Sequence, residues 1–482
     1  MYYIWLWQKK QEQNLCYNEI MDIEKRARRQ SRRVIISEIL MVVTVIITVS
    51  ILAFVVSGYW VGSDFKIERQ GLLQIYSTPT GADVEIDNSP SSWLQRTNTS
   101  KTLAAGEHTI KLEKEGYDSW SRTINITEGL LYRLHYPRLF LQNRIHETAY
   151  NSSANFATIS PDRNTMLLIN NTTTWQLLNL DTDTAIKPTE LDLSKVLPFV
   201  SQAQNAEMGL FTGIISDAKW ASDNEHLLLK ITNGSATNYL LLSIKNPATS
   251  INLTKEFNAD FTDVEIINSS ATNLLVLLNG NLHLVDTTTK QISAVLVPEV
   301  VSFDHYNQNV VFSTKKDIGL LKLGSNEITS LKDISTPVTV AISKFYDDEY
   351  IFTIDDTMLT IYLKDDFVKK TDFNLTFHPD KVKVGLDGEA LTMYTGGRII
   401  TLDMEATKIN EWNTETDTFG WLDASMIYAV KDGILNVYDF NGENHRTLSS
   451  NVSTHFPITI TSDKYLYYFR DGSLIREYLY EK

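Results

Sequence analysis

Cysteine is almost missing from this 482-residue sequence, in which Cys16 is the only one. Everything after residue 16 therefore lacks disulfides and thiolate metal sites. Stability must come from buried apolar side chains, for which a hydrophobic content of 43% is sufficient. With 21% charged residues, the composition is that of a folded protein and not of a disordered one.

Positive charge is scarce beyond residue 61. Residues 1–61 contain eight Lys/Arg and five Asp/Glu, whereas the rest of the chain contains 36 Lys/Arg and 54 Asp/Glu. Such an acidic region should repel nucleic acid and anionic lipid headgroups. No nucleic-acid partner is therefore expected.

Motifs of catalysis and cofactor binding are also missing. The sequence has no Gly-x-Ser-x-Gly, no His-Glu-x-x-His, no phosphate-binding glycine-rich loop and no dinucleotide fingerprint. Asp181-Thr-Asp183 resembles the start of a calcium loop, but the glycine and glutamate that such a loop needs do not follow. We therefore predict no catalytic, cofactor-binding or metal-binding residues, and do not expect an enzyme.

One long apolar run is present. No residue from Ile39 to Ser63 is charged, and this run of 25 residues exceeds the about 20 that a bilayer-spanning helix needs. A signal peptide would have a shorter run and a small-x-small cleavage site, and a core helix would show a polar face. We predict one transmembrane helix over residues 34–61, with Tyr59 and Trp60 in the interfacial aromatic belt.

The charges beside this run predict its orientation. Arg28, Arg29, Arg32 and Arg33 precede it, whereas the flank that follows carries no net charge. The positive-inside rule places residues 1–33 in the cytoplasm as a basic tail, and the C-terminal region outside the cytoplasm. The predicted location is the cell membrane, with a single span. Met21 opens a more ordinary N-terminus than Met1, and we take it as a hypothetical true start.

Residues 71–136 are predicted to form a small β-sandwich. Apolar and polar residues alternate in Leu72–Tyr76, Asp83–Asp87, His108–Leu112 and Ser121–Ile126, as they do in half-buried strands. Proline, glycine and asparagine separate these segments and mark the turns between them.

Two motifs of this region resemble a known family. Ser77-Thr-Pro-Thr-Gly-Ala-Asp-Val-Glu-Ile-Asp87 and Leu103-Ala-Ala-Gly-Glu-His-Thr-Ile-Lys-Leu-Glu-Lys-Glu-Gly-Tyr117 are similar, in order and spacing, to the two halves of a PEGA domain. Thr80 replaces the glutamate of the family name and Asn88 replaces a glycine, and turns accommodate both changes. The resemblance implies a prokaryotic envelope protein in which this module binds a partner or acts as a spacer.

Short strands and tight turns dominate residues 137–482. Asn-Gly and Asp-Gly dipeptides, such as Asn279-Gly280 and Asp432-Gly433, lie between apolar runs, which is the strongest short-range signal of a hairpin. Third strands end in an aspartate, as at Asp286, Asp403 and Asp439. Repeated units open near Ile159, Trp220, Ile266, Ser302, Ile342, Val384, Trp421 and Thr459. A period of about 40 residues with four strands in each unit is typical of a β-propeller.

The predicted fold class is an all-β region, a small β-sandwich plus a seven- or eight-bladed β-propeller, on a single N-terminal transmembrane helix. Eight units can be counted, but the first two are irregular. The last unit lacks a strand, which Arg138–Gln142 is expected to supply, thereby latching the ring. Residues 182–217 are interpreted as an extended blade loop or, alternatively, as an insertion that caps the ring. Ile159-Ser-Pro-Asp162 and Trp220-Ala-Ser-Asp223 resemble the blade openings of WD-type and TolB-like propellers, and the rest of those signatures is missing.

Exposed aromatic rings are the candidate ligand contacts. Trp93 and Trp120 follow turns of the small module and could stack on sugars, whereas Trp220 and Trp421 open blades and are expected in the core. The leading hypothesis is a membrane-anchored extracytoplasmic binding or scaffold protein of the cell envelope, with cell-wall polysaccharide or a surface protein as partner. The alternatives are a hydrolase or lyase with a site in the central channel, and an envelope sensor.

Overall fold

The chain forms two compact units, which are described separately below. The computed structural model describes Met21 and residues 37–54, 59–61, 67–90, 96–201, 209–267, 269–384, 390–416 and 418–480. The first unit takes its described residues from 21–75, 99–109 and 123–133, and the second takes them from 76–98, 110–122 and 134–480.

The first unit begins with the helix Ser37–Phe54, which is long and apolar enough to cross a membrane and is not buried by the rest of the chain. Its threonines are satisfied without water, because Thr44 and Thr48 each donate a 2.8 Å hydrogen bond to the carbonyl four residues earlier. The prediction that the helix extends to residue 61 is wrong. Residues Tyr59–Val61 form strand β1, which pairs with β2 (Ile67–Ile75).

Two small sheets follow the helix. In one, β2 pairs with β1, β5 (Thr99–Ala104) and β8 (Leu131–Leu134). The other has the order β4-β3-β6-β7, and its strands are β3 (Asp83–Ile86), β4 (Ser89–Pro90), β6 (Gly106–Glu113) and β7 (Trp120–Ile126). Asp87 and Asn88, between β3 and β4, have φ values of 52° and 58°, a conformation that Asn and Asp tolerate. Asn88 can therefore replace the glycine of the family pattern.

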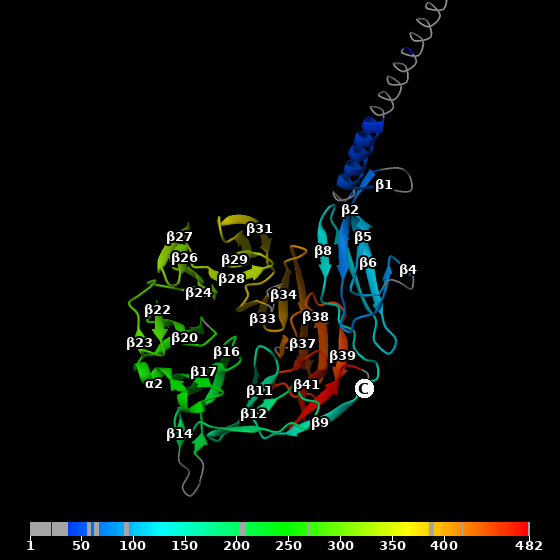
Figure 1. The fold of residues 1–482 in the computed structure, drawn as a ribbon. Helices are drawn as coiled ribbons and strands as arrows, with labels where there is room; N and C mark the ends of the chain where they lie inside the picture. The colour runs from blue at the N-terminus through cyan, green and yellow to red at the C-terminus, as the bar shows by residue number, and fades with distance from the viewer. Residues whose placement is uncertain are drawn as a thin grey trace, which may run out of the picture. The chain divides into compact units, whose positions relative to one another are not determined.

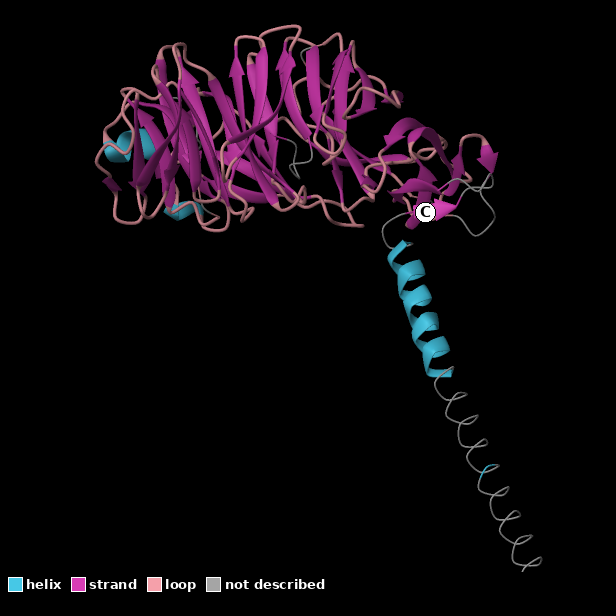
Figure 2. Cartoon of the chain, turned by 90° about the horizontal axis from the view of Figure 1, so that it is seen from above, coloured by secondary structure: helices cyan, strands magenta, loops and turns pink. Residues whose placement is uncertain are grey.

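Besides most of the sheet β4-β3-β6-β7, the second unit contains eight four-stranded antiparallel sheets among the described residues, which we call blades 1 to 8 (Figures 1 and 2). Blade 1 comprises β10 (Phe156–Ile159), β11 (Thr165–Ile169), β12 (Thr174–Asn179) and β13 (Thr189–Asp192). Blade 2 comprises β16 (Ile214–Trp220), β17 (His226–Asn233), β18 (Ala236–Ser243) and β19 (Ile251–Asn252). Blade 3 comprises β20 (Phe261–Ile266), β21 (Asn273–Leu278), β22 (Asn281–Asp286) and β23 (Gln291–Ile292). Blade 4 comprises β24 (Ser302–Tyr306), β25 (Asn309–Ser313), β26 (Asp317–Lys322) and β27 (Glu327–Asp333).

Blade 5 comprises β28 (Thr339–Phe345), β29 (Asp348–Asp355), β30 (Met358–Leu363) and β31 (Val368–Asn374). Blade 6 comprises β32 (Lys381–Val384), β33 (Ala390–Thr395), β34 (Arg398–Asp403) and β35 (Lys408–Asn413). Blade 7 comprises β36 (Phe419–Trp421), β37 (Met426–Lys431), β38 (Ile434–Asp439) and β39 (Arg446–Ser449). Blade 8 comprises β40 (Thr459–Thr461), β41 (Tyr465–Arg470), β42 (Ser473–Tyr478) and, as its last strand, β9 (His146–Asn151). All eight predicted unit openings lie in the first strand of a blade.

The blades are arranged in a ring, with their first strands toward its middle and their last strands toward its rim (Figure 1). Apolar clusters join successive blades, because each sheet buries its faces against its neighbours. Tyr394 and Phe419, 4.8 Å apart in edge-to-face contact, link blades 6 and 7. Met166 and Leu168 of blade 1 pack with Tyr467 of blade 8, so the ring closes.

The closing strand is not the predicted one. Strand β9 pairs with β42 and completes blade 8, whereas Arg138–Gln142 bonds to the turns of the small module. Leu139 and Gln142 donate to the carbonyls of Thr78 and Gly116 through their backbone N–H groups. The latch was correctly expected to come from the segment before blade 1, but it starts at His146.

Tight turns follow the predicted chemistry. In Asn279-Gly280 and Asp432-Gly433 both residues have φ between 50° and 75°, as a type I′ turn requires. The long segment before blade 2 supplies the outer strand β13 and a two-stranded hairpin, β14 (Val200–Ser201) with β15 (Leu210–Phe211). Helical structure in the ring is limited to η1 (Pro247–Thr249) and α2 (Leu253–Phe257) among the described residues, shown in cyan in Figure 2.

Candidate functional site

Charged side chains gather on the first strands of blades 2 and 3. The Lys219 ammonium (β16) lies 2.6 Å from Glu265 Oε1 and 3.2 Å from Asp263 Oδ1, both on β20. Asp217 Oδ2 lies 3.7 Å from the same nitrogen. Three carboxylates from two neighbouring blades thus surround one cation.

Strand irregularities help to place these groups. Residues two apart in a strand point to the same face, so Asp217 lies beside Lys219 and Asp263 beside Glu265. The register of β16 against β17 shifts just before Asp217, and that of β20 against β21 shifts just before Asp263. Bulges of this kind bend a strand and redirect its side chains.

Blade 4 adds an aspartate and a histidine. Asp304 Oδ2 accepts a 2.9 Å hydrogen bond from the Ile342 N–H of blade 5, and burial raises the pKa of its carboxyl group. Burial also lowers the pKa of His305, which is therefore uncharged at neutral pH. Its Nδ1 is buried without a hydrogen-bond partner among the described residues. We call Asp217, Lys219, Asp263, Glu265, Asp304 and His305 the inner-strand cluster.

The two residues in closest contact within the cluster respond differently to pH. Burial raises the pKa of Glu265 to about 7, although Lys219 opposes that shift. Burial alone would lower the pKa of Lys219, but the carboxylates of Glu265 and Asp263 raise it above its usual value. Lys219 is therefore a permanent cation, and Glu265 is a group that can exchange a proton near neutral pH.

One lysine of blade 6, Lys383, is within electrostatic reach of the cluster. Lys381 and Lys383 lie two apart on β32, and Lys381 Nζ lies 5.9 Å from the ring centre of Tyr394. Burial and the repulsion of Lys381 lower the pKa of Lys383, and the charges of Asp217 and Lys219 also act on it. Among the described residues, neither lysine has a carboxylate within ion-pair distance.

The structure places the predicted contact residues elsewhere. Trp93 and the orientation residues Arg28, Arg29, Arg32 and Arg33 lie outside the described residues. Trp120 is fully buried, so the expectation of an exposed ring for sugar stacking is wrong. Its indole N–H donates a 2.8 Å hydrogen bond to Asp439 Oδ2 at the end of β38.

Trp120 belongs to a buried set of contacts with blades 6 to 8. The Arg122 guanidinium donates to Asp403 Oδ2 at 3.2 Å, and Arg138 Nε donates to Asp423 Oδ2 at 3.0 Å. All four of these side chains are buried. Burial raises the pKa of Asp439 to about 6, although Asn444 and Trp120 donate to it. These contacts hold the segments 119–122 and 136–144 against the propeller.

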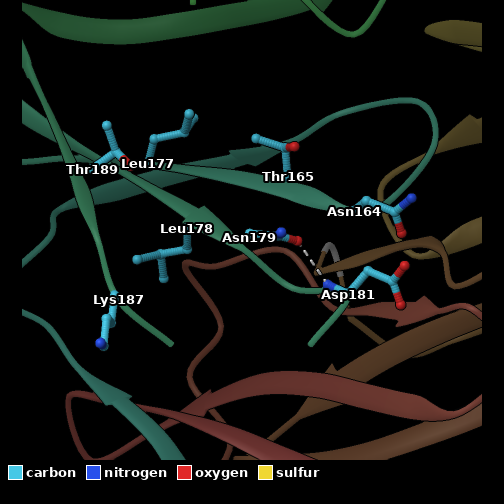
Figure 3. A pocket seen from close by; sticks show the side chains of 8 residues that line it. All are labelled: Asn164, Thr165, Leu177, Leu178, Asn179, Asp181, Lys187 and Thr189. Atoms are coloured by element: carbon cyan, nitrogen blue, oxygen red, sulfur yellow. Dashed lines mark hydrogen bonds between the residues drawn. The ribbon is translucent and has the colours of Figure 1, made fainter. Parts of the chain in front are cut away.

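A polar pocket with a volume of about 340 Å³ lies at one edge of blade 1 (Figure 3). Its lining residues are Asn164, Thr165, Leu177, Leu178, Asn179, Asp181, Lys187 and Thr189. Asn179 Oδ1 accepts a 3.0 Å hydrogen bond from the Asp181 N–H, and Asp181 Oδ1 accepts one from Ser462 at 2.8 Å. The first is a local turn contact, and the second joins blade 1 to the turn between β40 and β41 of blade 8.

Sequence reasoning missed the inner-strand cluster. Its signal was present, because Asp217-x-Lys219 and Asp263-x-Glu265 lie at blade openings, where apolar residues are expected. The aspartates that end third strands were noticed, and Asp403 and Asp439 are the residues that accept from the small module. Among the described residues, no group of three or more His, Cys, Asp or Glu is arranged to hold a metal ion.

A comparison with family models identifies the small module. Residues 70–138 match the PEGA domain. The PEGA domain thus lies where its two motifs predicted it, and it includes Trp120, Arg122 and Arg138. A comparison with curated proteins found no match to the chain.

Propellers are among the solved structures that the chain resembles. Hsv2 of Kluyveromyces lactis has 10% identity and a TM-score of 0.41, over 62% of this chain and 99% of that one. The propeller domain of Cps50 (Swd1) from Myceliophteria thermophila has 11% identity and a TM-score of 0.39, over 71% of this chain and 99% of that one. PorZ, a surface component of the type-IX secretion system of Porphyromonas gingivalis, has 11% identity and a TM-score of 0.39, over 67% of this chain and 42% of that one. The propeller assignment itself rests on the eight blades.

Proposed function

We propose that the chain is a single-pass membrane protein whose propeller lies outside the cytoplasm and binds a component of the cell envelope, either wall polysaccharide or a surface protein. One observation carries the proposal: an apolar, unburied helix, Ser37–Phe54, precedes the all-β region. The basic residues before the helix and the acidic region after it favour a cytoplasmic N-terminus. The PEGA domain, residues 70–138, is the next domain along the chain.

The chemistry of the inner strands favours binding over proton transfer at their central group. Lys219 is held as an ammonium by carboxylates, so it does not act as a base. A propeller also offers a broad surface of loops around its ring, which suits recognition of a large partner.

Topology is tested on intact cells that carry the full chain with a C-terminal epitope tag. External protease should remove the tag from wild-type cells, and replacing Arg28, Arg29, Arg32 and Arg33 with alanine should leave part of the protein protected. A matched control replaces Lys101, Lys111, Lys114 and Arg133, which lie far from the helix in sequence, and should keep the wild-type pattern. A tag that stays protected in wild-type cells contradicts the proposed topology.

Binding is tested with the full chain in detergent micelles. Purified cell wall and a mixture of envelope surface proteins are each incubated with it, and retention is measured at low and high salt. Retention by one of them supports the proposal. Failure of both to retain a folded protein contradicts it.

A second candidate function, a hydrolase or lyase at the ring axis, is favoured by one observation. Glu265 has a pKa of about 7 and lies beside a fixed cation, as in sites where a carboxyl group exchanges protons. Cleavage of a glycan or peptide that is lost in Glu265→Gln, with binding retained, would support this candidate. Equal turnover in the two proteins would remove it.

A further inference from the structure

We propose that the turn of residues 127–130 in the PEGA domain lies in the membrane–water interface, with the side chain of Leu130 inserted among the lipids. The partner of this surface is the bilayer that the helix of the same chain spans. The inference rests on the proposed function, because it takes the helix Ser37–Phe54 to be a membrane anchor. It adds a second contact with lipid, which would fix how far the domain stands from the bilayer.

Backbone hydrogen bonds join this turn, which connects β7 to β8, to the strand β2. The Gly129 N–H donates a 3.1 Å hydrogen bond to the Gln70 carbonyl oxygen. The Leu72 N–H donates a 2.9 Å hydrogen bond to the Leu130 carbonyl oxygen. The turn therefore extends the sheet beside residues 70–72.

Close packing fixes the turn to β2 as well. A Cβ atom on Gly71 would lie 2.6 Å from the carbonyl oxygen of Thr127, so only glycine lets the strand approach the turn this closely. A Cβ atom on Gly129 would lie 2.8 Å from the guanidinium carbon of Arg69. The turn and the first half of β2 therefore form one body, and a constraint on Arg69 is also a constraint on the turn.

The covalent chain holds Arg69 near the membrane. Tyr59 of β1 is its Cα partner, and partners in antiparallel strands lie about 4.5–5.5 Å apart. Tyr59 follows Phe54, where the helix ends, by five residues, which span at most about 18 Å. The aromatic residues Tyr59 and Trp60 are also of the kind that favours the interface. Arg69 thus lies within roughly 23 Å of the helix end, whatever the orientation of the domain.

The turn presents an apolar side chain at this place. Leu130 is 61% exposed, and its hydrogen-bonded neighbour Leu72 is 36% exposed. Exposed leucines are common on protein surfaces, so exposure alone assigns no partner. Here the exposed leucine lies on a turn that the chain tethers beside the bilayer. Transfer of its side chain from water to lipid is favourable and needs no rearrangement of the fold.

Charge does not drive this contact. Residues 64–69 contain two acidic and two basic residues, and the turn itself adds Glu128. A surface without excess positive charge is not drawn to anionic headgroups. The contact should therefore form equally with neutral and anionic lipids, and added salt should not weaken it.

The experiment uses the full chain reconstituted in lipid vesicles. Because Cys16 is the only cysteine, Cys16→Ser provides a background in which one new cysteine carries a fluorophore. Lipids with a nitroxide near the headgroup should quench a fluorophore at Leu130→Cys. Ser100→Cys is the matched control, since Ser100 is exposed and pairs with Gln74, about 17 Å farther along the sheet than Arg69. Equal quenching at the two positions, or no quenching at Leu130→Cys, overturns the inference.

A fluorophore at Thr127→Cys then tests whether the leucine itself makes the contact. Adding Leu130→Asp should lower the ratio of docked to undocked domain about ten-fold, because the gain from burying one leucine is of that order. Val368→Asp, at a 52% exposed valine of β31, is the control and should leave the quenching unchanged. Equal effects of the two substitutions overturn the inference. Quenching that requires anionic lipid and disappears with salt also overturns it, because the contact would then be electrostatic.

Failure of this inference is distinguishable from failure of the proposed function. A fluorophore at Val45→Cys, in the helix, should be quenched by lipids with a nitroxide in the middle of the acyl chain. Quenching there without quenching at Leu130→Cys keeps the membrane anchor and removes only the second contact. Absence of quenching at both positions contradicts the membrane anchor as well.

Discussion

The indole N–H of Trp120 donates a 2.8 Å hydrogen bond to Asp439 Oδ2, and both side chains are fully buried. Trp120 lies in the match to the PEGA domain, whereas Asp439 ends the third strand of blade 7. The carboxylate also accepts from Asn444 at 2.8 Å, and its other oxygen has no partner among the described residues. Losing one donor would therefore leave a buried charge poorly compensated.

Trp120→Phe should lower the free energy of unfolding by at least about 1–3 kcal/mol, because the donor to Asp439 is lost and the smaller ring leaves a cavity. Trp412→Phe is the matched control, since the buried Trp412 Nε1 has no hydrogen-bond partner among the described residues. Its cost should be smaller. Denaturant unfolding of the full chain in micelles, followed by circular dichroism, measures both. Equal losses in the two variants would show that the hydrogen bond contributes nothing.

Arg138→Met should cost about 3–5 kcal/mol, because it leaves the buried Asp423 without its cation. The side chains of this pair are only 9% and 7% exposed. The control is Arg96→Met, whose pair with Asp83 is 66% and 67% exposed and should change stability by less than about 1 kcal/mol. The same unfolding measurement compares them. A cost for Arg138→Met no larger than that of the control would contradict the buried-pair argument.

Stability should fall as the pH rises from about 4 to 7. Burial raises the pKa of Asp439 to about 6 and the pKa values of Glu265 and Glu477 to about 7, above the usual values of 3.8 for aspartate and 4.5 for glutamate. The folded state then binds more protons than the unfolded state in this interval, so raising the pH favours unfolding. Each group accounts for roughly 3 kcal/mol at 1.36 kcal/mol for each pH unit.

Unfolding curves at several pH values test this interval. Asp439→Asn and Glu477→Gln should each flatten the decline, whereas Asp192→Asn, which replaces an exposed carboxylate whose pKa is lowered, should not. The assignment would be refuted if the free energy of unfolding of the wild-type protein rose between pH 4 and 7 by as much as these groups should lower it.

Glu147→Ala should weaken the latch between β9 and β42. Glu147 Oε1 accepts hydrogen bonds of 2.9 Å from both Arg476 Nε and the Tyr478 hydroxyl group, and Arg476 is buried. We expect a loss of about 2–4 kcal/mol and faster proteolysis near residues 146–151. Glu327→Ala, which removes an exposed glutamate of another outer strand, is the control and should leave both unchanged.

Local patterns in the sequence predicted local structure well. The first strand of every blade was located because apolar alternation and Asn-Gly or Asp-Gly turns are properties of neighbouring residues. The errors lie where distant segments compete. Tyr59–Val61 continues an apolar run but pairs with β2, and the latch could have been any strand-like segment before blade 1.

Local sequence patterns also failed to predict the candidate site, because its residues are distant from one another in the sequence. Trp120 meets a partner 319 residues away, and Lys219 meets one 46 residues away. Charged residues at blade openings could be read from the sequence, but not their convergence. That convergence depends on which blades are neighbours and on two bulges that redirect the side chains.

The pairing of β9 with β42 also determines how late during synthesis the ring can close. Glu147 and Arg476 are 329 residues apart, so at roughly 5–20 residues per second the ribosome needs tens of seconds to deliver the second after the first. During that interval the β9 edge is available to any other strand. The protein should therefore depend on chaperones while it is being made, and early release of an incomplete chain should produce aggregates instead of a smaller ring.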